Sequence, residues 1–103
     1  MDYAKQIEIT GEALAEAVKA EMALEDTRPQ IKFAAIERIM AAGDNPLTGK
    51  PHSFSSAEAQ VHVDQTYVDF LARVREATVN RIRARAQYEA ALAQARIHTE
   101  TVA

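Results

Sequence analysis

Apolar side chains recur every three or four positions along both halves of the chain, which is the spacing that places them on one face of an α-helix. In the second half, one such stripe follows the heptad repeat of a coiled coil. Its a positions are Tyr67, Val74, Arg81, Tyr88 and Ala95, and its d positions are Val63, Phe70, Ala77, Ala84 and Ala91. In the first half, the same spacing predicts a helix from about residue 2 to residue 25. The apolar face of that helix carries Tyr3, Ile7, Leu14, Val18 and Met22.

Pro29 predicts a break in this first helical arm. Proline has no backbone N–H and disfavours helical geometry at the preceding residue, here Arg28. We therefore expect a second helical segment from Gln30 to Ala42. That segment is apolar nearly all round, which predicts that it is well buried. Gly43 is a natural place for it to end.

A capping pattern marks the start of the second arm. Residues 55–58 (Ser-Ser-Ala-Glu) fit the S-x-x-E capping box, in which the first and fourth side chains satisfy free backbone N–H groups. Phe54 is placed for an apolar contact with Ala59. Neither Gly nor Pro occurs over residues 56–99. The sequence therefore predicts one long helix over that range, about 60 Å in length.

These elements predict a single all-α domain over residues 1–103. The first arm covers residues 1–42, a connecting loop covers 43–55, and the long second helix covers 56–99. We expect the arms to fold back on each other as an antiparallel helical hairpin.

The long helix also carries a second, weaker apolar seam on another side. This seam consists of Val61, Val68, Ala72, Val79, Ile82, Ala86, Ala93 and Ile97. Because one partner arm can cover only one stripe, two stripes predict a coiled-coil-like homo-oligomer. The alternative is that Ala and Val on an exposed face serve only as spacers.

Composition excludes several kinds of chemistry. The chain has no cysteine, which excludes disulfides, thiolate metal sites and cysteine nucleophiles. No apolar run is long enough to cross a bilayer, so we expect a cytoplasmic protein with no membrane partner. No nucleophile, base and orienting group occur in a recognisable arrangement. Glu58 and His62 share a helix face, but two ligands without a third or fourth make a poor metal site. We therefore expect no enzymatic activity, no cofactor and no metal.

Arg81 interrupts the apolar stripe, and a charged group facing a seam is costly unless it is paired. Glu21 lies on the apolar face of the first arm, so a Glu21–Arg81 ion pair that sets the register of the hairpin is the favoured interpretation. The alternative is a site for nucleic acid or an acidic partner, made by Arg73, Arg81, Arg83 and Arg85. The isoelectric point of about 5.6 and the different directions of these side chains favour the ion pair.

The central loop is the best candidate for a recognition surface. It takes about twelve residues to join two helices, whereas roughly 2–8 are common. Its candidate partner-binding residues are Asn45, Leu47, Lys50, His52 and Phe54. Gly49-Lys50 matches part of a phosphate-binding loop, but Pro51 stands where that motif requires Ser or Thr. The alternative role for the loop is to fold over the tip of the hairpin and cap it.

Residues 45–53 (Asn-Pro-Leu-Thr-Gly-Lys-Pro-His-Ser), with residues 55–58, are similar to a segment of small, uncharacterised bacteriophage and prophage proteins. The resemblance implies a phage-borne accessory protein in the bacterial cytoplasm, with an unidentified host or phage protein as partner, and it implies no catalytic residues. We expect function by non-enzymatic protein–protein interaction. The alternatives are a nucleic-acid-binding accessory protein and a structural self-assembly protein.

Overall fold

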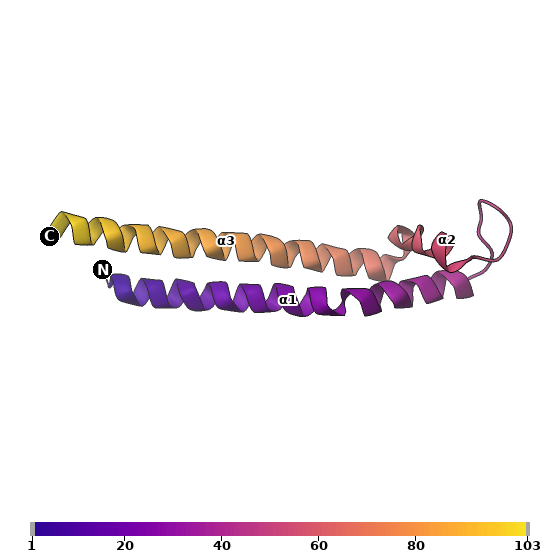
Figure 1. Cartoon of the computed structure of the whole chain (residues 1–103), viewed down its shortest axis with the longest axis horizontal. Helices are drawn as coiled ribbons and strands as arrows, with labels where there is room; N and C mark the ends of the chain where they lie inside the picture. Colours follow the sequence, from indigo (N-terminus) through magenta and orange to yellow (C-terminus); the bar gives the residue numbers. More distant parts are fainter. Residues whose placement is uncertain (1, 103) are drawn as a thin grey trace. The chain divides into compact units, whose positions relative to one another are not determined.

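The computed structural model describes residues 2–102, and these form four helical elements (Figure 1). They are α1 (Tyr3–Ala41), the short α2 (Phe54–Glu58), the 3₁₀ turn η1 (Val61–Val63) and α3 (Gln65–Val102). Among these residues the β-type pairing is limited to one isolated bridge, between Asp44 and Pro51 in the loop. The predicted all-α class and hairpin-like layout are confirmed.

The chain divides into two compact units, and both long helices contribute to each of them. The first unit combines residues 1–23 with residues 75–103, and the second consists of residues 24–74. In the first unit, α1 and α3 run antiparallel. The Tyr3 ring stacks on His98 with 4.6 Å between ring centroids, and Glu21 meets Arg81 farther along the same pair of helices.

Small residues line the contact between the helices of the first unit. Ala77, Ala84 and Ala91, three of the predicted d positions, are buried there. On the facing helix, a Cβ atom added to Gly11 would lie 3.3 Å from the Tyr88 ring. The heptad stripe of α3 is therefore the side that packs on α1, and its buried positions in this unit are alanines.

The second unit contains the large buried side chains. Phe70 is 1% exposed and Ile36 is 2% exposed, and both belong to this unit. Smaller or partly polar residues complete its core: Ala35, Ala57, Tyr67 and Val74. Removal of a fully buried aromatic side chain such as that of Phe70 typically costs about 3–5 kcal/mol, so Phe70 is a major source of apolar stabilisation in this unit.

The predicted break near Pro29 is wrong, because α1 continues through it. An interior proline removes one helical hydrogen bond and costs about 3 kcal/mol in a helix with no other support. Here the helix is supported by packing on both sides of the proline, through half-buried Leu24 and buried Ala35 and Ile36. Tertiary packing therefore outweighs the local preference.

The expected burial of residues 30–42 is only partly correct. Ala35 and Ile36 are buried, but Phe33 is 51% exposed and Met40 is 42% exposed. A helix that is apolar nearly all round has more apolar surface than one neighbouring segment can cover.

The predicted continuous helix over residues 56–99 is also wrong in its first turns. The cap is Ser53 rather than Ser55: the Ser53 Oγ accepts a hydrogen bond from the backbone N–H of Ser56 at 3.1 Å. The helix that follows, α2, stops at Glu58, and α3 begins only at Gln65. Phe54 lies inside α2 and packs against Phe33, with 6.3 Å between ring centroids. Val63, predicted as a seam position, lies in η1 and is 66% exposed.

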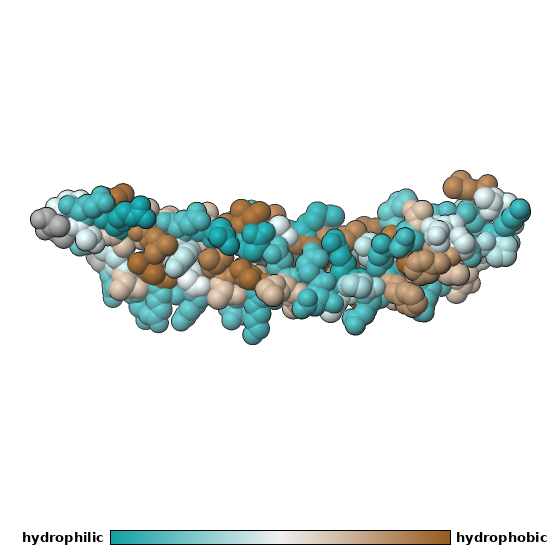
Figure 2. Space-filling view, in the orientation of Figure 1, coloured by the Kyte–Doolittle hydropathy of each residue, from teal (hydrophilic) through white to brown (hydrophobic). Residues whose placement is uncertain are grey.

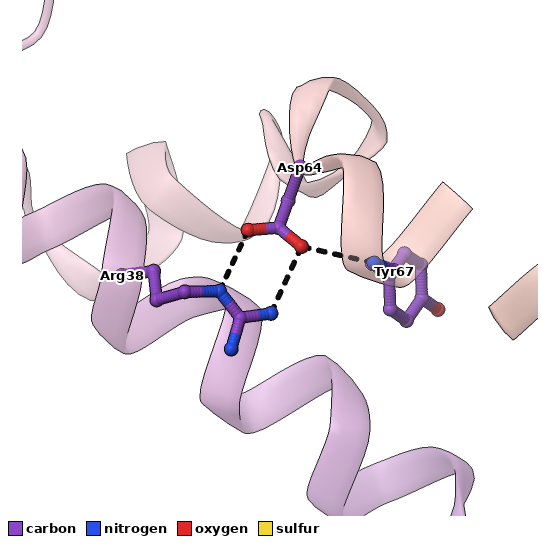
Figure 3. Close-up of polar contacts among 3 residues, drawn as sticks. All are labelled: Arg38, Asp64 and Tyr67. Atoms are coloured by element: carbon purple, nitrogen blue, oxygen red, sulfur yellow. Dashed lines mark hydrogen bonds and ion pairs between the residues drawn. The ribbon is translucent and has the colours of Figure 1, made fainter. Parts of the chain in front are cut away.

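Asp64 is the N-cap of α3, and it also binds Arg38 of α1 (Figure 3). Its Oδ1 accepts a hydrogen bond from the backbone N–H of Tyr67 at 2.9 Å, which is an N-cap contact. The same carboxylate accepts two hydrogen bonds from Arg38 of α1, from Nε and from a terminal nitrogen, each at 2.9 Å. The Arg38 guanidinium, and to a smaller extent the Tyr67 N–H, lower the pKa of Asp64 below its ordinary value of 3.8.

This geometry predicts a pH-dependent contribution of Asp64 to stability. A carboxylate whose pKa is lowered by folding stabilises the protein above its unfolded pKa of about 3.9, and loses that effect as the pH falls through its folded pKa. Asp64→Asn keeps a good N-cap but removes the charge. We expect this variant to be less stable than the wild type at pH 7 and to approach it as the pH falls below about 4.

Urea titrations at several pH values measure the difference between the two proteins. Asp64→Ala is the matched comparison, because it also removes the cap acceptor and should cost about 1 kcal/mol more than Asp64→Asn. A wild-type advantage that stays unchanged down to pH 2 would contradict the assignment.

Candidate functional site

The central loop between α1 and α2 is an ordered turn built around Asn45. The Asn45 backbone N–H donates to the carbonyl of Lys50 at 2.8 Å, and the Asn45 carbonyl accepts from the Gly49 N–H at 2.8 Å. Gly49 has a φ of +70°, a conformation that favours glycine. These contacts fold the loop back on itself, next to the bridge between Asp44 and Pro51.

The Asn45 side chain fastens this turn to the rest of its unit. Its Oδ1 accepts from the Leu47 backbone N–H at 3.0 Å and from Gln60 Nε2 at 3.2 Å, and Asn45 as a whole is 7% exposed. The expectation that Asn45 itself lies on a recognition surface is therefore wrong. A buried amide needs hydrogen-bond partners, and here these partners give the loop its shape.

The other predicted loop residues differ in exposure. Leu47 is 85% exposed, and Lys50 is exposed as well. Figure 2 shows brown, apolar atoms at the end of the molecule that carries this loop. His52 is half-buried, with Nδ1 3.0 Å from the Ser56 Oγ, and Phe54 is 49% exposed while it packs on Phe33. Leu47 and Lys50 are thus the freely accessible members of the set.

The structure pairs Glu21 with Arg81 in the first unit. Arg81 Nε donates to Glu21 Oε1 at 2.7 Å, and the two side chains are 29% and 18% exposed. The pKa of Glu21 is lowered, first by a hydrogen bond from the Thr78 side chain and then by Arg81. Arg81, the a position that interrupts the apolar stripe, is thus paired with a carboxylate of α1.

The remaining arginines of the candidate nucleic-acid site do not share one face. Arg73, Arg83 and Arg85 are exposed, and none of them meets a carboxylate within the described part of the chain. Arg73 instead lies over the Phe70 ring, 5.7 Å from its centroid. At about 100° per residue, the three side chains leave α3 in widely different directions. They do not form a continuous basic surface.

Sequence reasoning missed Arg38 and Asp64, which form the bidentate ion pair of the second unit. The available indication was Asp64 itself, since Asp is a preferred N-cap and stands directly before a long run of helix formers. A further cross-element pair, Lys32–Glu58 at 3.4 Å, is largely exposed.

Over residues 2–102, no three His, Asp or Glu side chains lie together in a way that could bind a metal. In the same range, neither long helix has a segment apolar enough to cross a bilayer. The chain was compared with models of protein families, with curated proteins and with solved structures, and none of them matches it.

Charge reversal tests whether Glu21 and Arg81 set the register of the helices. Glu21→Arg and Arg81→Glu should each lower the midpoint of thermal unfolding, because each places two like charges in the seam. The double variant should recover most of the loss. Circular dichroism melts measure the effect.

Arg85→Glu is the matched control, because Arg85 is exposed one turn away. We expect a change within about 0.5 kcal/mol for it. A double reversal that is as unstable as either single variant would show that the pair does not act as a unit.

Proposed function

We propose that this protein acts by binding another protein, not by catalysis, with the central loop as its recognition surface and with self-association through α3. The proposal rests on one observation above all. Hydrogen bonds to the buried Asn45 side chain keep the loop ordered, and in this ordered loop Leu47 is 85% exposed.

An exposed leucine on an ordered turn is well suited to recognition. Full burial of a leucine side chain is worth about 1.5–3 kcal/mol, and a loop that is already ordered loses little entropy on binding. The partner of this surface is a protein with an apolar pocket that accepts Leu47 and with acidic groups that meet Lys50. The resemblance of the loop to phage proteins favours a host or phage protein in the bacterial cytoplasm.

Uncovered apolar side chains on α3 support self-association. Val79, Ile82 and Ile97 are 44%, 54% and 61% exposed. A long helix with apolar residues outside its first contact is typical of helices that associate further.

The second candidate function is nucleic-acid binding through Arg73, Arg83 and Arg85. The exposure of these arginines, without a carboxylate partner among the described residues, favours it. Their different directions around α3 count against it, because nucleic-acid-binding helices concentrate positive charge on one face. A third candidate is structural self-assembly alone, in which the loop has no partner.

Sedimentation velocity separates these functions. The pure protein is measured alone and with labelled single- and double-stranded oligonucleotides, at low and moderate salt. We expect a discrete oligomer that leaves the oligonucleotides behind. Co-sedimentation that weakens steeply with salt would instead support the arginine surface, because released counterions produce that dependence.

The loop is tested with immobilised wild-type protein and a Leu47→Ser, Lys50→Glu variant, incubated with bacterial extract. We expect proteins that bind the wild type and not the variant. Identical captured proteins for both would reject the loop as the recognition surface and leave self-assembly.

A further inference from the structure

Two open hollows lie next to each other on the first unit, and the described residues that line them carry no Asp, Glu, Lys or Arg. The hollows measure ≈ 400 and ≈ 420 Å³ and share Gln94. Charged residues make up 26% of the chain, yet none of the described residues that line these two hollows is one of them. Depletion of charged residues is a property of the central part of protein interfaces.

The side chains around the hollows follow helical spacing on both helices. On α3 they occur at steps of three and four residues, and on α1 at a step of three. We call the following six residues the uncharged face: Gln6, Ile9, Gln87, Ala90, Gln94 and Ile97. Ile9 is 48% exposed and Ile97 is 61% exposed, so the described residues leave about half or more of these two apolar side chains uncovered. On the side of the molecule seen in Figure 2, brown apolar groups alternate with teal polar ones.

Among its described residues, the first unit has no large side chain that is fully buried. Within it, the described residues that are buried are Ala77, Ala84 and Ala91, while the large buried side chains belong to the second unit. A pair of helices must bury an apolar side against something, and small alanines alone provide little stabilisation.

Two charged residues lie next to the uncharged face, on the side toward the middle of α1 and α3, and they indicate which partner covers it. Arg83 continues the α3 spacing, four residues before Gln87, and Glu16 continues the α1 spacing, seven residues after Ile9. Both are exposed, and neither forms an ion pair within the described residues.

The two charges lie at nearly the same level along the unit. Gly11 lies against Tyr88, and Glu21 lies against Arg81. Glu16 is midway between Gly11 and Glu21, so its level corresponds to residues 84–85 of α3. Arg83 is therefore only about 2–3 Å away along the axis.

We propose that a second copy of this chain packs on the uncharged face, related by a two-fold axis parallel to the helices. This inference rests on the proposed self-association and specifies its surface. Such an axis places α1 of one copy against α3 of the other at the same level. Glu16 of each copy then meets the partner's Arg83, which gives two equivalent ion pairs. All neighbouring helices are then antiparallel, as in a four-helix bundle. The facing amides of Gln6 and Gln94 satisfy each other, because an amide both donates and accepts.

The test is the dimer dissociation constant, measured on the full chain by sedimentation equilibrium at several concentrations. Ala90→Glu places a charge inside the interface, and Glu16→Arg and Arg83→Glu each place like charges opposite each other. We expect each of the three variants to weaken the dimer at least about tenfold. The double variant with both Glu16→Arg and Arg83→Glu should restore it. Circular dichroism checks that each variant remains helical.

Arg85→Glu is the matched control, because Arg85 is exposed on the same helix and its side chain leaves α3 about 140° away from that of Ala90. We expect it to leave the dimer intact. A dimer that survives Ala90→Glu but is lost with Arg85→Glu would overturn this inference and leave the proposed self-association standing on another side of α3. A wild-type monomer at every concentration would overturn both, and a charge swap that fails to restore a dimer lost in each single variant would overturn the proposed axis.

Discussion

The antiparallel register of α1 against α3 is the constraint on which the rest of the structure depends, and one ion pair maintains it in each unit. Arg38 and Asp64 form the pair of the second unit, and Glu21 and Arg81 form that of the first. In both cases the residue numbers add up to 102, so the same register applies to both units. Alanines at the d positions allow the helices to approach, but small apolar residues alone specify register weakly, since one alanine resembles the next. Charged groups in the contact specify it because a shifted register would leave them unpaired.

The same register determines which surfaces remain available. It directs the heptad stripe of α3 toward α1 and therefore leaves Val79, Ile82 and Ile97 outside the contact. It also brings exposed Glu16 and Arg83 to one level at the edge of an uncharged face. The loop follows from different contacts: Asn45 organises it by hydrogen bonds, and Leu47 is exposed as a result. We propose that the uncharged face binds a copy of the chain and that the loop binds another protein.

The sequence predicted the features that depend on periodicity. The heptad positions Phe70, Val74 and Ala77 are buried, and the interruption of the stripe at Arg81 led to its partner Glu21. Features that depend on a choice between local and distant interactions could not be predicted in this way. Pro29 stays helical because neighbouring residues pack, and a local rule cannot weigh that packing. The long helix begins after Asp64 and not at residue 56. The bidentate contact between Asp64 and distant Arg38 outweighs the helix-forming composition of residues 56–63.

Intramolecular distances between spin labels on the two helices test the shared register most directly. One label replaces exposed Ala15 on α1, and the second replaces Val79, Ala86 or Ala93, which are exposed on one side of α3 at seven-residue spacing. Excess unlabelled protein removes distances between chains. The register places Ala15 level with Ala86, so that pair should give the shortest distance. Val79 and Ala93 lie about 10 Å from Ala86 along the axis, in opposite directions, so they should give longer, similar distances. A shortest distance to Val79 or to Ala93 would mean a slipped register, and three uniformly long distances would mean that the helices do not pair within one chain.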